Sequence, residues 1–284
     1  MNNSKALKHY VTLNNGSPWQ IHYRSQGQGK PVILLHPSPL SSNFMLPMMN
    51  LLAENNQVFA WDAPGYGQSD PLPENSGGLA PYVDALKLFI DALNLEDAVI
   101  YGSATGAQIA IEYAKAYPNS INGIVLENAA WFYDEEREEI LKQYFPNIEP
   151  KEDGSHLTLV WKIANQLYHY FPWFDTSEKA RVSHAEIPAE LKHQTLMEYF
   201  TAGKNYHLAY EAAFMNERPE QLAKVTIATH LIRWESSMLK PYVDRLDKAD
   251  LPANIEMKHA DAGIENRFAT LQSSVKTLSN LSGK

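Results

Sequence analysis

The chain alternates short apolar runs with stretches whose apolar residues recur at helical spacing. Apolar runs that end in turn residues are typical of buried strands in a parallel sheet. They lie at 31–39, 57–70, 98–103, 121–130, 226–234 and 253–263. Helical spacing marks 81–95 and 107–118, with Pro81 suited to a first turn, and 11–24 alternates around a Gly/Ser turn like a hairpin. This order predicts an α/β protein with a mostly parallel central sheet flanked by helices.

The stretch 131–222 breaks this alternation and is predicted to be helical throughout. It is rich in aromatic residues: Trp131, Phe132, Tyr133, Tyr144, Phe145, Trp161, Tyr168, Tyr170, Phe171, Trp173, Phe174, Tyr199, Phe200, Tyr206, Tyr210 and Phe214. These rings are expected to form a small core of an inserted cap, and some of them to line a ligand pocket beneath it. We therefore predict a core domain from 1–130 and 223–284, and a helical cap from 131–222.

Composition narrows the possible partners and reactions. A net charge of −9 argues against nucleic acid, because phosphate contacts need clustered Lys and Arg. The absence of cysteine excludes disulfides and thiol catalysis and fits a cytoplasmic location, and no signal peptide or membrane span is expected. The 10 histidines are scattered without H-E-x-x-H, so neither a metal nor another cofactor is predicted. A small-molecule partner is expected, with the chain a monomer or a homodimer.

The sequence "GSATG" at 102–106 has the outline of a nucleophile elbow, G-x-S-x-G, with Ala104 where the serine belongs. An alanine side chain has no nucleophilic atom. Centring the motif on Ser103 gives large flanking residues, Tyr101 and Thr105, and centring it on Thr105 loses the glycine pair. Neither alternative register restores the usual motif, although each would supply a hydroxyl.

Two further segments carry a family resemblance. "LLHPSP" is similar to an oxyanion-loop motif, with Pro37 in place of the usual glycine, and "WDAPGYGQSD" matches the pattern D-x-P-G-x-G-x-S. Together with the elbow, in this order, they resemble the α/β-hydrolase superfamily, with a cap inserted after the sixth strand. The resemblance implies that the backbone N–H groups of Ser38 and Thr105 face a developing oxyanion even without a serine.

The resemblance also assigns the positions of a catalytic triad, which are occupied here by Ala104, Met238 and Ile264. His259, five residues before Ile264, could supply a base only if the loop is short, and is otherwise a strand histidine. Glu127 stands where some family members place a relocated acid, or else is a satisfied carboxylate at the cap hinge.

The catalytic region is predicted to contain His36, Ser38, Ala104, Thr105, Glu127 and His259. The substrate-binding region is predicted to contain Ser103, Trp131, Phe132, Trp234, Glu235 and Ile264. Arg233 or Arg267 is expected to pair with Glu235 or Glu265, or alternatively to hold a ligand carboxylate.

Three functions remain compatible with the sequence. The first is a hydrolase-fold protein that binds a small, fairly apolar molecule, or transforms it without Ser-His-Asp hydrolysis. The second is a capped hydrolase of esters or carbon–carbon bonds that is disabled by alanine at position 104. The third is a non-catalytic protein that binds another protein through its cap. Fold alone does not choose among them.

Overall fold

The structure is a computed structural model that describes residues 5–14, 16–73 and 77–281. Two earlier predictions concern residues outside these ranges. Residue 15 belongs to the predicted hairpin turn, and residues 1–4 belong to the N-terminal segment in which no signal peptide is expected. The strands are β1 (Leu7–Asn14), β2 (Pro18–Gln26), β3 (Lys30–Leu35), β4 (Asn56–Trp61), β5 (Ala98–Ser103), β6 (Ile121–Glu127), β7 (Thr229–Trp234) and β8 (Ile255–Ala260). The α-helices are α1 (Leu46–Leu52), α2 (Ala80–Ala92), α3 (Thr105–Ala116), α4 (Asp134–Tyr144), α5 (Ser155–Gln166), α6 (Ala189–Ala202), α7 (Leu208–Asn216), α8 (Pro219–Leu222), α9 (Lys240–Val243) and α10 (Ile264–Ser279). Short 3₁₀ helices span Glu178–Ala180, Gly203–Asn205 and Asp244–Lys248.

The strands form one sheet in the order β1-β2-β4-β3-β5-β6-β7-β8. β1 pairs with β2 and β2 with β4 in antiparallel fashion, whereas every other neighbouring pair is parallel. The predicted α/β class and its mostly parallel sheet are confirmed. Parallel strands end at the same edge of the sheet, so the loops that follow β3, β5, β6 and β7 meet there.

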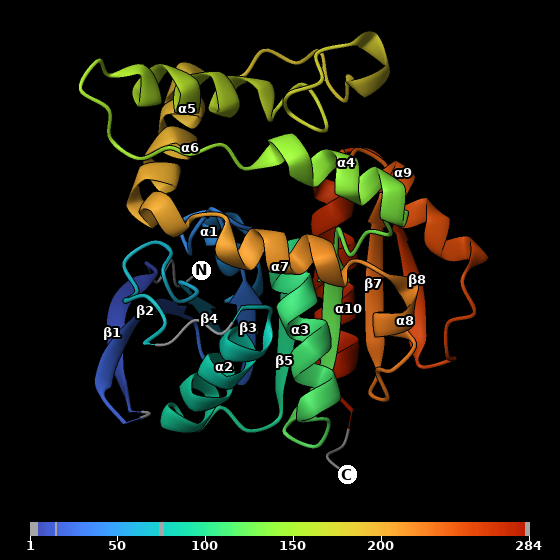
Figure 1. Ribbon diagram of the computed structural model, residues 1–284. Coiled ribbons are helices and arrows are strands. Elements are labelled where there is room, and N and C mark those ends of the chain that lie inside the picture. Colours follow the sequence, from blue (N-terminus) through green and yellow to red (C-terminus); the bar gives the residue numbers. More distant parts are fainter. Residues whose placement is uncertain (1–4, 15, 74–76, 282–284) are drawn as a thin grey trace.

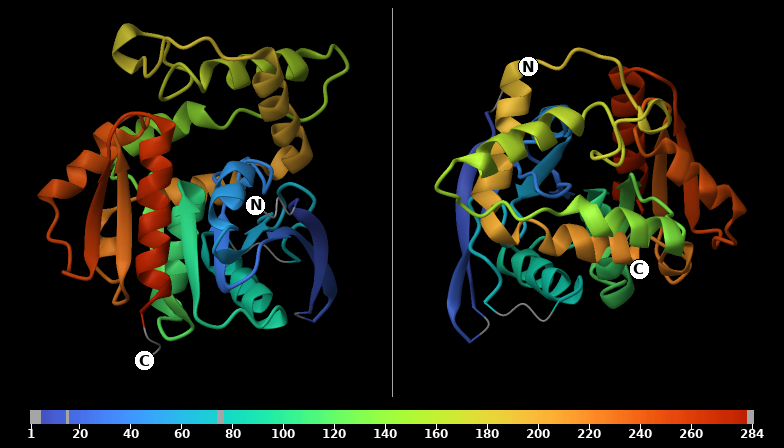
Figure 2. Two further views of the ribbon diagram at one scale, coloured as in Figure 1. Left: turned by 180° about the vertical axis from the view of Figure 1, so that it is seen from behind. Right: turned by 45° about the horizontal axis from the view of Figure 1, so that its top comes forward.

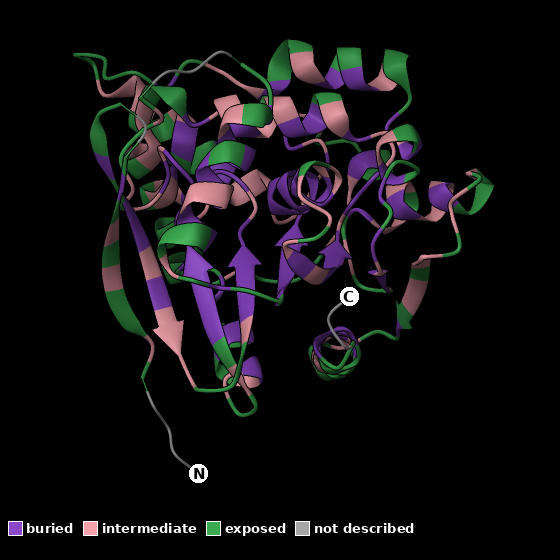
Figure 3. Cartoon of the chain, turned by 90° about the horizontal axis from the view of Figure 1, so that it is seen from below, coloured by how far each residue is buried: buried purple, intermediate pink, exposed green. Residues whose placement is uncertain are grey.

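Helices cover both faces of the sheet (Figures 1 and 2). One core contains buried residues of α2 and α3 against the sheet, and a second contains those of α1 and α10. Central strands are therefore buried on both sides, as the purple strands in Figure 3 show, and every residue of β5 is buried. This two-sided burial is why these strands are continuous apolar runs in the sequence.

Between β6 and β7 the chain forms α4 to α8, and helices α4 to α7 lie across the carboxyl ends of the strands (Figure 1). A third core, made of the aromatic residues of this insertion, lies within it. The prediction of helix throughout 131–222 is wrong for 145–154, between α4 and α5, and again for 167–188, which is mostly irregular. Pro172 and Pro188 fall in this stretch and disfavour helix, and Trp173 Nε1 anchors it by donating to Tyr144 O at 3.0 Å.

No helix in the described ranges is long and apolar enough to span a membrane.

Candidate functional site at the carboxyl end of the sheet

The nucleophile elbow is present in its usual geometry with alanine at its tip. Ala104 joins β5 to α3 at φ 48° and ψ −111°, a conformation that costs a non-glycine residue energy. A Cβ on Gly106 would lie 2.2 Å from Leu35 O, and one on Gly102 would lie 2.3 Å from Gly106 O. The two glycines therefore allow α3 to approach β3 and β5 closely, which is what the motif requires.

Backbone donors remain around Ala104. The Ala104 N–H donates to Glu127 O at 3.0 Å and ties the elbow to the end of β6. Among the residues that the structure describes, the N–H groups of Ser38 and Thr105 have no hydrogen-bond acceptor. The Thr105 Oγ1 atom is also buried without a partner. The predicted pair of oxyanion donors is thus unoccupied by protein groups, next to the N-terminus of α3.

We call residues 36–45, which follow β3, the oxyanion loop. His36 fastens its start, because Nε2 accepts from the Ala63 N–H at 2.9 Å and Nδ1 lies 3.1 Å from Pro37 O. Nε2 must therefore be unprotonated, and Nδ1–H donates to the carbonyl. Burial lowers the pKa of His36, which keeps the ring neutral in this position. Both ring nitrogens hold the backbone, and neither is directed by a hydrogen bond toward the elbow.

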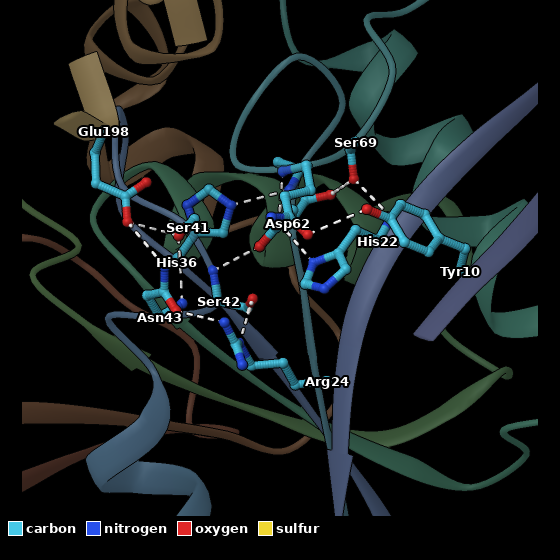
Figure 4. A network of polar contacts seen from close by, with 12 residues as sticks. Tyr10, His22, Arg24, His36, Ser41, Ser42, Asn43, Asp62, Ser69 and Glu198 are labelled. Atoms are coloured by element: carbon cyan, nitrogen blue, oxygen red, sulfur yellow. Dashed lines mark hydrogen bonds and ion pairs between the residues drawn. The ribbon is translucent and has the colours of Figure 1, made fainter. Parts of the chain in front are cut away.

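Figure 4 shows how Asp62 fixes the rest of this loop. Its carboxylate accepts from Ser42 N at 2.7 Å, Gln68 N at 2.8 Å and the ring of His22 at 2.7 Å. Burial acts to raise the pKa of Asp62, but these partners lower it overall, so the carboxylate is ionised at neutral pH. The D-x-P-G-x-G-x-S segment therefore supports the oxyanion loop.

The positions assigned to the triad acid and base are open to solvent. Met238 is 36% exposed and Ile264 is 46% exposed, at the start of α10. His259 is exposed on edge strand β8 rather than turned inward. In the described part of the chain, no histidine ring is hydrogen-bonded to Ser103, Ala104 or Thr105.

Glu127 has an arginine where a relocated triad acid would have a histidine. Its carboxylate, 1% exposed, accepts from Arg267 Nε at 2.7 Å, Arg267 Nη2 at 2.9 Å and Tyr101 Oη at 2.5 Å. Burial acts to lower the pKa of Arg267, but Glu127 and Tyr101 raise it overall, so the guanidinium stays charged. Arg267 from α10 and Glu127 from β6 thus form a buried, bidentate ion pair, and Tyr101 from β5 donates a further hydrogen bond to it.

The predicted arginine pairings were therefore wrong. Arg267 pairs with Glu127, and Arg233 forms a bidentate pair with Asp247, at 2.9 and 2.6 Å. Glu235 is exposed and lies 3.6 Å from Lys240. The partner of Arg267 lies 140 residues away along the chain, whereas that of Arg233 lies 14 residues away, in the 3₁₀ helix Asp244–Lys248.

A second polar chain lies beside the elbow and was missed in the sequence. Asn128, at φ 57° directly after β6, donates through Nδ2 to Ser103 Oγ at 3.3 Å and accepts from Ser237 Oγ at 2.6 Å. The only signal in the sequence was its place at a strand end, beside Glu127. The Ser103 hydroxyl is therefore engaged in a hydrogen bond within the protein.

The remaining predicted binding residues separate into two groups. Trp131 is half-buried and Phe132 is buried, and they lead from β6 into the aromatic core of the insertion. Trp234 ends β7, where its Nε1 donates to Gly263 O at 3.0 Å and its ring packs on the Arg267 guanidinium. These three rings are packed within the protein, while Ile264 and Glu235 are exposed.

The insertion contains a buried acid that the sequence did not single out. Glu217, at the end of α7, is 5% exposed, and within the described ranges its carboxylate has neither a hydrogen bond nor an ion pair. Burial raises the pKa of Glu217 well above its usual range, with Arg137 opposing the shift only partly. Its neighbours include Tyr144 and Tyr210, whose hydroxyls lie 2.9 Å apart.

We expect Glu217→Gln to raise the free energy of unfolding at pH 7–8 by about 1–3 kcal/mol. The folded chain binds this proton more tightly than the unfolded chain, so stability is highest at acid pH and falls as pH rises through the folded-state pKa. Urea unfolding across pH 4–8 should show that fall in the native chain and a smaller one in the variant. Glu211→Gln, an exposed change in the same helix, is the control. Lower stability of Glu217→Gln at pH 7 would mean that the carboxylate is ionised and favourably paired.

No group of three or more His, Cys, Asp or Glu side chains in the described ranges has the arrangement of a metal site.

Comparison with known proteins agrees with this geometry. A family model described as alpha/beta hydrolase fold matches residues 30–149. The chain is 30% identical over 130 residues, 44% of its length, to a cis-3-alkyl-4-alkyloxetan-2-one decarboxylase from Shewanella oneidensis, and covers 40% of that protein. It is 24% identical over 191 residues, 67% of its length, to an (E)-2-((N-methylformamido)methylene)succinate hydrolase from Acinetobacter baylyi, covering 68% of it. The chain spans less than half the length of the first curated relatives that it matches.

Solved structures match along nearly the whole chain. An epoxide hydrolase from Vigna radiata superposes with a TM-score of 0.71 at 15% identity, covering 96% of this chain and 98% of that one. A bromoperoxidase from Bacillus anthracis gives 0.68 at 16% identity, covering 95% and 99%. At such identities the likeness concerns the fold. Together with the family match over residues 30–149, which include the oxyanion loop and the elbow, this likeness shows that the chain has the α/β-hydrolase fold.

Proposed function

We propose that this protein binds a small, fairly apolar molecule with a carbonyl or carboxylate group between its core and its aromatic insertion, without Ser-His-Asp hydrolysis. The observation that carries the proposal is the elbow with Ala104 at its tip, whose N–H donors are free while Glu127 is held by Arg267. A carbonyl oxygen of the ligand would accept hydrogen bonds from the N–H groups of Ser38 and Thr105. No nucleophile would then attack the carbonyl carbon, and no general base would activate a water molecule.

The distribution of the family match supports this proposal. The matched residues 30–149 contain the oxyanion loop and the elbow, whereas Met238 and Ile264 lie outside them. The proposed oxyanion donors and the glycines of the elbow thus lie within the matched segment, and the positions assigned to the acid and base lie beyond it. One relative is named for a decarboxylation and another for a hydrolysis, and both names specify small organic molecules. The proposed reaction class is ligand binding, or a non-hydrolytic conversion in a shaped site.

Hydrolysis of p-nitrophenyl acetate by the native chain and by Ala104→Ser tests the absence of a triad. We expect both rates to stay within about 10³–10⁴ of the uncatalysed reaction, because donors alone give that much. Ala104→Gly, which lacks the hydroxyl and accepts the same φ, is the matched control. A gain of several orders of magnitude with serine, titrating near the pKa of an imidazole, would instead identify a disabled hydrolase.

Binding is tested by the thermal midpoint of the native chain in the presence of butanoate, hexanoate and octanoate. A ligand that binds only the folded state raises the midpoint, and each added methylene buried contributes about 0.8 kcal/mol. Affinity should therefore increase with chain length. An unchanged midpoint with all three acids would count against a carbonyl or carboxylate ligand at this site.

A further inference from the structure

The middle of the oxyanion loop is held from the core by two charged side chains. Asp62 accepts from Ser42 N at 2.7 Å. Arg24, from β2 and 8% exposed, donates through Nε to Ser42 Oγ at 3.1 Å and through Nη2 to Asn43 Oδ1. These contacts fix one side of the segment 41–43, only three residues beyond Ser38.

The other side of the same segment is held by the insertion (Figure 4). Glu198, on α6, accepts through Oε1 from Ser41 Oγ at 2.8 Å and from Asn43 Nδ2 at 3.4 Å. A helix of the insertion therefore contacts the loop that carries one of the two oxyanion donors.

Within the described residues, the other hydrogen bonds between the insertion and the core do not involve residues 41–43. Tyr66 Oη donates to Tyr206 O at 2.9 Å, and Asn216 Nδ2 donates to Gln108 and Glu112 on α3, at 3.0 and 2.9 Å. Glu198 is thus distinguished by its partners: its contacts fall on the oxyanion loop, whereas those of Asn216 fall on the helix behind the elbow.

We propose that Glu198 is a positioning residue that couples the placement of the insertion to the shape of the oxyanion loop. Movement of α6 shifts Ser41 and Asn43, and with them the direction of the Ser38 N–H. A ligand that enters beneath the insertion would then meet a donor whose geometry depends on how the insertion sits. This inference rests on the proposed role of Ser38 in ligand binding.

The strength of this contact is expected to change with pH. The charged groups that face Glu198 from the core are Arg24 and Asp62, and the sum of burial and these neighbours raises the pKa of Glu198. Release of α6 into water would lower that pKa again, so the contact takes up a proton when it forms. The contact is therefore tightest at acid pH and weakens as pH rises through the raised pKa.

Backbone hydrogen exchange of the loop measures the coupling without a ligand. The hydrogen-bonded amides that report on it are those of Leu40, Ser42, Phe44 and Met45. Glu198→Ala should exchange at these amides about tenfold faster than the native chain, because the hydrogen bonds from Ser41 and Asn43 to the side chain are lost. Glu198→Gln keeps an acceptor for Ser41, so it should retain native protection, and its protection should vary less with pH than that of the native chain.

Asn216→Ala is the matched control, because it removes a contact between the insertion and α3 instead. It should leave exchange in the loop unchanged. Equal acceleration of the loop in Asn216→Ala and Glu198→Ala would overturn the proposal, because Glu198 would then only attach the insertion. Native exchange in Glu198→Ala, or a failure of Glu198→Gln to retain protection, would also overturn it. Loss of the proposed function would appear separately, as ester hydrolysis by Ala104→Ser with loop exchange unaffected.

Discussion

Arg267→Met should lower the free energy of unfolding by about 3–5 kcal/mol, measured by urea denaturation at pH 7. The substitution removes the partner of Glu127, whose carboxylate is 1% exposed, and leaves a negative charge in the core. Only the Tyr101 hydroxyl would still donate to it. The cost arises from the uncompensated carboxylate, and not from the attraction within the pair, which desolvation largely offsets.

Addition of Glu127→Gln to Arg267→Met separates these two contributions. The amide is neutral and its oxygen can still accept from Tyr101, so the double variant should regain most of the lost stability. Lys142→Met is the surface control: both side chains of its pair with Glu139 are more than half exposed, so its loss should leave the stability nearly unchanged. A loss below about 1 kcal/mol in Arg267→Met would show that the Glu127 carboxylate is solvated once its partner is removed, and that the buried ion pair is not needed for stability.

The parts of the molecule that the sequence predicted are those whose causes are local. The central strands are buried on both faces, so their apolar runs stand out in the sequence. Pro81 lies in the first turn of α2, and Pro118 follows the end of α3. The elbow was recognisable because Gly102 and Gly106 are required by backbone contacts within and beside the motif itself. Such local steric requirements restrict which residue types can occur, so they produce patterns that are visible in a single sequence.

The parts that were missed depend on partners far away along the chain. The partner of Arg267 is Glu127, 140 residues distant, and nothing in either segment identifies the other. Glu217 and Glu198 are ordinary glutamates in helical sequence, and only the packed insertion buries the first and sets the second against the oxyanion loop. The irregular stretch 167–188 follows the same logic, since Trp173 is held there by a tertiary contact with α4.

Gly106→Ala should destabilise the fold by several kcal/mol, on the order of the largest overpacking effects. The new Cβ would lie 2.2 Å from the carbonyl oxygen of Leu35, and neither α3 nor β3 can yield without moving the elbow. In an ordinary helix the same change would be stabilising, by up to about 1 kcal/mol. The sign of the effect therefore reports whether α3 is pressed against the sheet as the elbow requires.

Gly203→Ala is the control for this prediction, because nothing lies within 4 Å of its Cβ position although its φ is +66°. At φ 66° and ψ −154° its backbone lies in a region that essentially only glycine adopts, so the change should cost backbone strain without a steric clash, on the order of 1–3 kcal/mol. Unfolding midpoints in urea compare the two. If Gly106→Ala were as stable as the native chain, α3 would have to stand off from β3. The Thr105 N–H would then no longer be fixed by the packing of α3 on β3, and the elbow would lose the feature on which its proposed binding of a carbonyl oxygen rests.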